Sequence, residues 1–139
     1  MNVAQDGFVL DPRLAADSAF VADGPLSQVR LMDDARFPWL LLVPRVAGAS
    51  EWTELDGAQQ RLLLAEINRV GTLVQAEAGV EKLNIGALGN LVRQLHVHLV
   101  GRRAGDPAWP GPVWGSGPAQ RFAQDQLRAR VEHWRQRLA

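Results

Sequence analysis

The segment Gln94-Leu-His-Val-His-Leu-Val100 alternates polar and apolar side chains almost from end to end. Successive side chains of a β-strand point to opposite faces of the sheet, so this spacing places Gln94, His96 and His98 on one face and the apolar residues between them on the other. The apolar face must pack against a second layer. The segment therefore predicts a strand that turns two of the chain's three histidines toward a cleft or solvent.

Three further segments have the patterns of strands in the same sheet. Residues 26–33 alternate roughly between apolar and polar side chains, whereas residues 37–43 form a continuous apolar run that is typical of a central strand covered on both faces. Residues 82–87 alternate with period two, and the turn-prone Leu88-Gly89-Asn90 separates them from residues 94–100. These patterns predict a mostly antiparallel sheet.

Two helices have recognisable beginnings. Asp11 is a possible N-cap with Pro12 at the first helical position, which predicts a short helix. Asp56 followed by Gln59 has the spacing of a capping box, and the apolar residues after it recur at helical spacing. A long second helix is therefore predicted, ending near Gly79.

The C-terminal third combines an irregular segment with a helical pattern. Residues 104–118 are rich in Gly and Pro but contain Trp109 and Trp114, which is typical of a loop that carries large apolar anchors. Pro118 is predicted to begin an amphipathic helix that reaches Leu138. Helices segregated onto an antiparallel sheet make an α+β domain.

Composition limits the partners of this domain. Fifteen Lys and Arg side chains balance fifteen Asp and Glu side chains, so no long-range field attracts a polyanion, and binding to nucleic acid or an anionic membrane is disfavoured. The absence of cysteine excludes disulfides and thiolate sites and fits a reducing compartment. Met1–Leu10 lacks the pattern of a signal peptide, and every apolar run is too short to span a bilayer. We expect one cytoplasmic domain over residues 1–139.

The histidine segment resembles the signature of the histidine triad (HIT) superfamily, in which histidines alternate with apolar residues and two apolar residues follow. The resemblance extends over roughly Gly24 to Gly115. The flanks that share it are Arg36–Pro44, Asn84–Gly86, Gly89–Arg93 and Trp109–Gly115, the last being similar to a bacterial, dinucleoside-polyphosphate hydrolase-like branch. The resemblance implies a HIT-like fold, a mostly antiparallel sheet of about five strands with one long central helix and a C-terminal helix.

The same resemblance implies a nucleotide phosphate hydrolase or nucleotidyl transferase that acts on dinucleoside polyphosphates or nucleoside phosphoramidates. His96 matches the nucleophile, which attacks the α-phosphorus and forms a nucleotidyl-histidine intermediate. His98, if protonated, would offset phosphate charge, and Gln94 occupies the first triad position. Because such chemistry relies on positioning and charge stabilisation, we expect no cofactor and no metal ion. We expect a homodimer, since HIT domains commonly pair through a helix and a sheet edge.

The resemblance also implies a substrate-binding set. Asn90 stands where the family has a phosphate-binding glutamine, and its shorter amide can still donate a hydrogen bond. Asp33 matches a position that contacts the ribose. Asn84 and Gly89, from the strand and turn before the histidines, complete the set, and a glycine there permits close approach of the backbone to phosphate.

Two departures from the family leave alternatives open. Gln94 can orient a neighbour but carries no proton near neutral pH, and Leu91 replaces a hydroxyl residue that helps the leaving group or the phosphate. The chain is then a slower enzyme, an enzyme with an altered substrate, or a nucleotide-binding regulatory module without turnover. A metal-binding scaffold is a further alternative, because histidines at i and i+2 of a strand can ligate one ion. The simplest alternative is a pair of hydrogen-bonded structural histidines.

Overall fold

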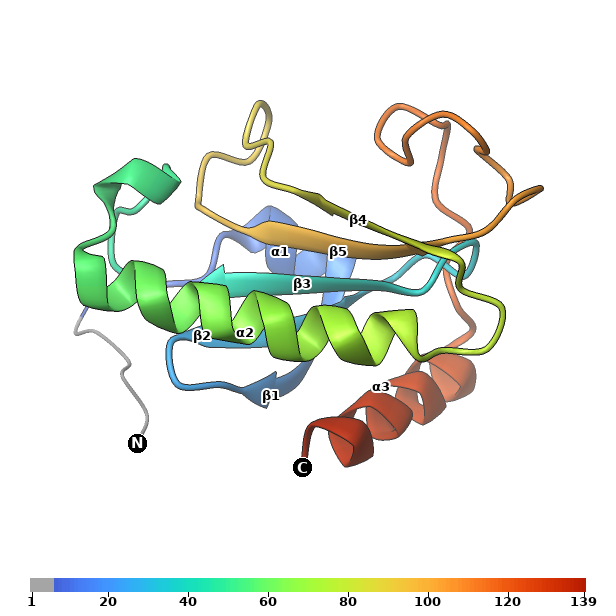
Figure 1. The fold of residues 1–139 in the computed structure, drawn as a ribbon, viewed down its shortest axis with the longest axis horizontal. Helices are drawn as coiled ribbons and strands as arrows, with labels where there is room; N and C mark the ends of the chain where they lie inside the picture. Colours follow the sequence, from blue (N-terminus) through green and yellow to red (C-terminus); the bar gives the residue numbers. More distant parts are fainter. Residues whose placement is uncertain (1–6) are drawn as a thin grey trace.

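The computed structural model describes residues 7–139 (Figure 1). Residues 1–6, which form much of the segment inspected for a signal peptide, lie outside the described residues. The elements in chain order are α1 (Pro12–Asp17), β1 (Ser18–Asp23), β2 (Ser27–Met32), β3 (Trp39–Pro44), a 3-10 turn (Trp52–Glu54), α2 (Gly57–Gln75), β4 (Lys82–Gly86), β5 (Val97–Arg102) and α3 (Gln124–Leu138).

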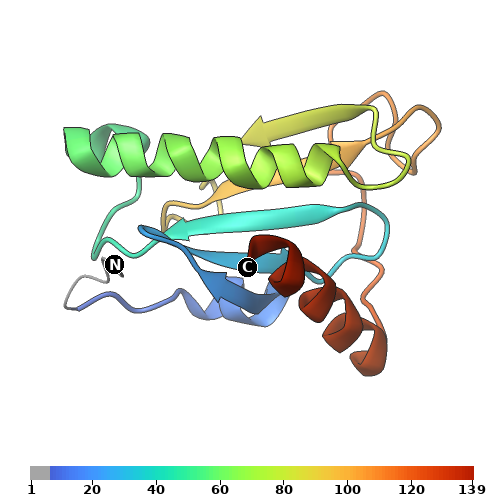
Figure 2. The same cartoon turned by 60° about the horizontal axis from the view of Figure 1, so that its bottom comes forward.

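The five strands form one antiparallel sheet in the order β1-β2-β3-β5-β4. In Figures 1 and 2, α2 runs along the sheet and α3 packs near β1 and β2. The predicted α+β architecture, a mostly antiparallel sheet of about five strands with one long helix and a C-terminal helix, is therefore confirmed. The sequence analysis assigned no strand to β1, because its pairing with β2 shifts register between Phe20 and Ala22 and this irregularity interrupts the alternation of side chains.

β3 is the central element, and all six of its residues are buried. Leu40 and Leu42 belong to the core that also contains the buried residues of α2 and α3. Trp39 and Leu41 belong to a second core on the opposite face, which includes Leu14 of α1. The predicted strand covered on both faces is confirmed, because α2 and α3 pack on one face of the sheet and the short α1 packs on the other.

The beginnings of α1 and α2 are confirmed. The Asp11 side chain accepts a hydrogen bond from the backbone N–H of Arg13, and Asp56 and Gln59 form a reciprocal capping box. α2 ends at Gln75, earlier than predicted, and Gly79 lies in the turn that follows, with a φ of +82°. Within residues 7–139, no helix combines the length and the apolar character that crossing a membrane requires.

The predicted beginning of the C-terminal helix is wrong, because α3 starts at Gln124 rather than at Pro118. The residues before it are bound to the β2–β3 loop. The backbone N–H of Ala35 donates to the carbonyl of Gln120 at 2.7 Å, and the N–H of Phe122 donates to Asp33 at 2.9 Å. These long-range bonds occupy backbone groups that a longer helix would use. The rest of α3 is amphipathic as predicted.

Glu66 links α2 to the turn between β1 and β2. Its side chain is 7% exposed, and its Oε2 accepts hydrogen bonds from the backbone N–H groups of Leu26 and Ser27, both at 3.0 Å. Two buried donors therefore depend on one carboxylate oxygen.

We expect Glu66→Leu to lower the free energy of unfolding by about 2–4 kcal/mol, because both backbone donors lose their acceptor inside the core. Glu66→Gln keeps an acceptor oxygen and should cost less. Urea denaturation measures both, and Gln75→Ala, at an exposed residue at the end of the same helix, is the control. A Glu66→Leu loss no larger than that of Gln75→Ala would contradict this role.

Candidate active site

A cleft of about 690 Å³ lies over the second core, on the sheet face that carries Trp39. Its wall is built from α1, the β2–β3 loop, the β4–β5 connection, β5 and the β5–α3 connection (residues 103–123). His96 and His98 both line it, although they are only 7% and 5% exposed. The two imidazoles are therefore shielded from bulk solvent but lie in the wall of an open cleft.

His96 directly precedes β5 and is held by the backbone. Its Nδ1 lies 2.6 Å from the carbonyl oxygen of Gln94. Because a carbonyl oxygen only accepts hydrogen bonds, this contact assigns the proton to Nδ1 and the lone pair to Nε2. Within residues 7–139, no hydrogen bond engages Nε2 of His96. The contact therefore fixes the orientation of the ring and leaves Nε2 without a hydrogen bond to the protein.

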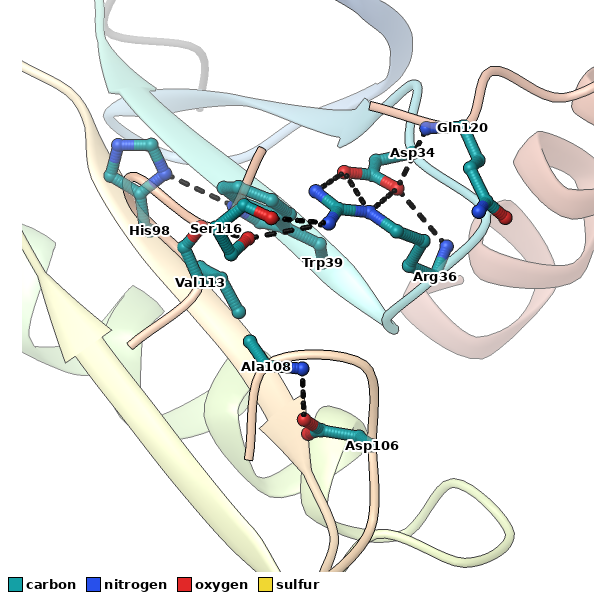
Figure 3. Close-up of polar contacts among 9 residues, drawn as sticks. All are labelled: Asp34, Arg36, Trp39, His98, Asp106, Ala108, Val113, Ser116 and Gln120. Carbon is teal, nitrogen blue, oxygen red and sulfur yellow. Dashed lines mark hydrogen bonds and ion pairs between the residues drawn. The ribbon is translucent and has the colours of Figure 1, made fainter. Parts of the chain in front are cut away.

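His98 is fixed in the opposite tautomer. The indole Nε1–H of Trp39, on the adjacent strand β3, donates to Nδ1 of His98 at 3.0 Å (Figure 3). Nε2 of His98 therefore carries the proton. Burial, and to a lesser extent the neighbouring His96, lower the pKa of His98 to about 3. The condition under which His98 was expected to offset phosphate charge is therefore not met, because the ring is neutral near pH 7.

Aromatic rings surround the histidine pair. The ring centroids of His96 and His98 are 4.9 Å apart, and Trp114 meets His98 edge to face at 5.3 Å. Trp114 rests against Gly86 of β4, where a Cβ atom would lie only 2.8 Å from its ring. Trp109, the other tryptophan of the loop, is 41% exposed and lies outside this group.

The β2–β3 loop supplies charged groups to the cleft. Asp33 lines the cleft and accepts hydrogen bonds from the backbone of Phe122 and the side chain of Arg121. Asp34 forms an ion pair with Arg36 at 2.8 Å, which Figure 3 shows beside Gln120. Burial acts to raise the pKa of Asp34, but hydrogen bonds from Arg36 and Gln120 hold it below its usual value. Neither Asp34 nor Arg36 was given a functional role from the sequence, because Asp34 stood only in a loop between strands and Arg36 only at the start of a segment that resembles the family.

The comparison with known proteins decides the family. The HIT domain model matches residues 13–105. The chain belongs to the HIT family.

Three solved HIT proteins are similar to this HIT chain over most of their length. The protein from Sinorhizobium meliloti 1021 is 48% identical, with 90% of this chain and 93% of that chain covered and a TM-score of 0.87. The protein from Bradyrhizobium japonicum is 43% identical, with coverage of 96% and 99% and a TM-score of 0.90. The protein from Marinobacter aquaeolei VT8 is 42% identical, with coverage of 94% and 96% and a TM-score of 0.91. No curated protein matches. Family membership supports a nucleotide-binding hydrolase or transferase.

Five of the site residues predicted for this HIT chain meet in the cleft, namely Asp33, Gly89, Asn90, His96 and His98. Gly89 and Asn90 lie in the β4–β5 connection, and Gly89 has a φ of +71°, which favours glycine. The structure therefore gathers the predicted nucleophile, His98 and three of the four predicted substrate-binding residues in one cavity.

Gln94 and Asn84 do not line the cleft. The amide of Gln94 accepts from the backbone N–H of Asp11 and donates to the carbonyl of Val9, both at 2.8 Å. It thereby ties the segment before α1 to the approach to β5. Oδ1 of Asn84 accepts from the guanidinium of Arg102 at 2.9 Å. Both side chains are hydrogen-bonded to other protein groups and take no part in lining the cleft.

Arg102 and Asp106 anchor the β5–α3 connection below Trp114. Their buried side chains form an ion pair at 2.7 Å, and Arg102 also donates to the carbonyl of Gly111. The hydrogen bond from Arg102 lowers the pKa of Asp106 to about 2. Figure 3 shows Asp106 accepting from the backbone of Ala108 in the same turn. Across residues 7–139, no three His, Asp or Glu side chains converge as a set of metal ligands.

The buried, neutral His98 makes folding sensitive to acid. Its ordinary pKa of 6.5 applies to the unfolded chain, whereas its folded-state pKa is about 3. Between pH 6.5 and 3, the unfolded chain therefore binds a proton at His98 that the folded chain does not bind. The stability that this residue contributes is complete above pH 6.5 and falls as the pH drops from 6.5 toward 3. We expect a loss of about 2 kcal/mol at pH 5 from this residue.

His98→Asn tests this assignment, because asparagine offers Trp39 an acceptor oxygen but does not titrate. Urea denaturation at pH 7, 6 and 5 should show a smaller acid loss in His98→Asn than in the wild type. The same dependence of stability on pH in both proteins would show that His98 is not held neutral by the fold.

Proposed function

We propose that this HIT protein is a nucleotide hydrolase or nucleotidyl transferase in which Nε2 of His96 attacks the α-phosphorus of a dinucleoside polyphosphate or nucleoside phosphoramidate. The observation that carries the proposal is the 2.6 Å contact between Nδ1 of His96 and the carbonyl of Gln94. It leaves the lone pair on the nitrogen that is not bound to the backbone. A neutral imidazole in this state is a competent nucleophile.

The reaction proceeds in two displacements. The bond from Nε2 of His96 to phosphorus forms as the bond to the leaving group breaks, and the proton on Nδ1 stays hydrogen-bonded to the Gln94 carbonyl while the ring gains positive charge. Water then attacks phosphorus, the P–N bond breaks, and the nucleoside monophosphate departs with release of a proton to solvent. Another acceptor in place of water makes the protein a transferase.

The replacement of the family's first triad histidine by Gln94 leaves the contact between Nδ1 of His96 and the backbone carbonyl of residue 94 in place. Gln94 meets the nucleophile through its backbone carbonyl, which any residue supplies, while its side chain secures the N-terminal segment. The replacement of the first triad histidine is therefore compatible with an oriented His96. We assign Gln94 the role of a positioning residue for this reason.

The remaining residues of the cleft fit a nucleotide. Gly89 and Asn90 offer a backbone approach and an amide donor to the phosphate, and Asp33 offers a carboxylate to the ribose. Asn84 acts at a distance, through Arg102 and the loop that carries Trp114. The lack of cysteine fits a cytoplasmic setting for this activity.

A nucleotide-binding module without turnover is the second candidate function. Leu91 lines the cleft and is 85% exposed, so the position that relatives fill with a hydroxyl residue gives no hydrogen bond to a leaving group. Calorimetry that finds nucleotide binding, together with the absence of any nucleoside monophosphate product, would favour this candidate.

We expect His96→Ala to lower the release of nucleoside monophosphate by at least about a thousandfold, because the covalent intermediate then has no nucleophile. Chromatography of the products measures the rate, and circular dichroism checks the fold. His133→Ala, which removes the third histidine, on α3 and outside the cleft, is the matched control. Undiminished turnover in His96→Ala would exclude the proposed mechanism.

A homodimer formed through the β4 edge and α2 is part of this proposal. β4 is the last strand of the sheet, and Ile85 on it and Leu64 on α2 are 52% and 53% exposed. An edge strand with unpaired backbone groups and an exposed apolar side chain favours pairing with a second copy.

Ile85→Lys should convert the dimer to a monomer in light scattering, because it places a charge in the centre of this edge. Arg128→Ala, an exposed position on α3, should leave the mass unchanged. A wild-type protein that is monomeric at micromolar concentration would contradict the proposed assembly.

A further inference from the structure

His98 is enclosed by groups that do not ionise. The neighbours that face it are Leu41 and Trp39 from β3, Gly86 from β4 and Trp114 from the β5–α3 connection. The titratable group in contact with it is His96, whose ring centroid is 4.9 Å away. No carboxylate among residues 7–139 therefore bonds to this ring, and none stabilises a positive charge on it.

Among the described residues, Trp39 is the one hydrogen-bonding partner of the His98 ring, and it can act only as a donor. An indole N–H donates and never accepts, so Trp39 bonds only to a ring whose Nδ1 is unprotonated. Protonation of His98, or a change to the other tautomer, would place two N–H groups head to head at 3.0 Å. Burial acts in the same direction, since it brings the pKa of His98 to about 3.

No other side chain in the described cleft wall is a ready proton donor. The remaining ionisable groups form ion pairs, namely Asp33 with Arg121 at 3.1 Å, Asp34 with Arg36 at 2.8 Å and Asp17 with Arg121 at 3.3 Å. These carboxylates accept hydrogen bonds from arginine, hydrogen bonds from Arg36 and Gln120 hold the pKa of Asp34 below its usual value, and a guanidinium does not release its proton near neutral pH. The Nδ1 proton of His96 is hydrogen-bonded to the Gln94 carbonyl.

We propose that Trp39 is a positioning residue that locks His98 as a neutral hydrogen-bond donor, and that the site is thereby restricted to nucleotides whose leaving group departs as a weak base. This inference rests on the proposed function and deepens it, because it separates the two substrate classes. His98 gives the reaction a hydrogen bond from Nε2, not a proton.

The two substrate classes differ in whether the leaving group must gain a proton during the first displacement. As Nε2 of His96 bonds to phosphorus, the electron pair of the breaking bond moves to the leaving group. A phosphate leaving from a phosphoric anhydride holds that pair on oxygen without needing a proton at neutral pH. An alkylamine leaving from a phosphoramidate must be protonated on nitrogen as the P–N bond breaks, and general acids typically accelerate such steps by about 10²–10⁴-fold. The site selects anhydrides over alkyl phosphoramidates.

A leaving-group series with the full-length protein tests the selection. The probes are diadenosine triphosphate, aryl esters of adenosine monophosphate with phenols of graded acidity, and an alkylamine phosphoramidate of the same nucleotide. We expect kcat/KM to fall steadily as the leaving group becomes more basic, with the phosphoramidate at least about 100-fold slower than the anhydride. A phosphoramidate cleaved as fast as the anhydride, in a reaction that requires His96, would overturn this inference alone. Turnover that persists in His96→Ala would overturn the proposed function and this inference with it.

Variants of Trp39 test whether its hydrogen bond fixes the tautomer of His98. Trp39→Phe removes the donor, and replacement by benzothienylalanine keeps the ring shape without the N–H if the phenylalanine variant folds poorly. Nitrogen-15 NMR of the histidine side chains reports the tautomer directly. We expect wild-type His98 to hold its proton on Nε2 between pH 5 and 8, and both variants to show a mixture of tautomers and a kcat at least about tenfold lower at similar KM.

Trp114→Phe is the matched control, because Trp114 packs against the same imidazole without bonding to it. This variant should keep the wild-type tautomer of His98. An unchanged tautomer and an unchanged kcat in the Trp39 variants would overturn the role of Trp39.

Discussion

The burial of β3 on both faces is the constraint on which the rest of the structure depends. All six of its residues are buried, so its side chains point alternately into the core formed with α2 and α3 and into the second core below the cleft. Because side chains alternate along β3, Leu40 and Leu42 pack against α2 and α3, while Trp39 lies on the other face and donates a hydrogen bond to His98. Packing and chemistry therefore share one strand, and a shift of its register by one residue would exchange them.

The two histidines show how backbone and side chain divide the control of protonation. A carbonyl holds His96 and an indole holds His98, and the two contacts assign opposite tautomers to neighbouring rings. One ring then presents a lone pair and the other an N–H. Neither contact involves a carboxylate, and burial keeps His98 neutral near pH 7 without one.

Local patterns predicted those parts of the molecule that local forces determine. Alternation predicted β4 and β5, and a continuous apolar run predicted β3, because each of these strands has a regular register with its partner, although β5 begins at Val97 rather than at Gln94. β1 was not predicted, because its register shifts. The C-terminal helix was predicted to begin at Pro118, because that proline suits a helix start and the bond that prevents one comes from Asp33, far away in the chain. The contact of Trp39 with His98 likewise requires the pairing of two distant strands, which no local pattern specifies.

The strap formed by residues 116–122 gives the C-terminal helix a share in the cleft. This strap supplies part of the wall and is fastened to the β2–β3 loop by Asp33, Asp34 and Arg36 before it continues into α3. Any local opening that releases this strap would therefore remove part of the cavity wall and loosen the start of α3 in the same event.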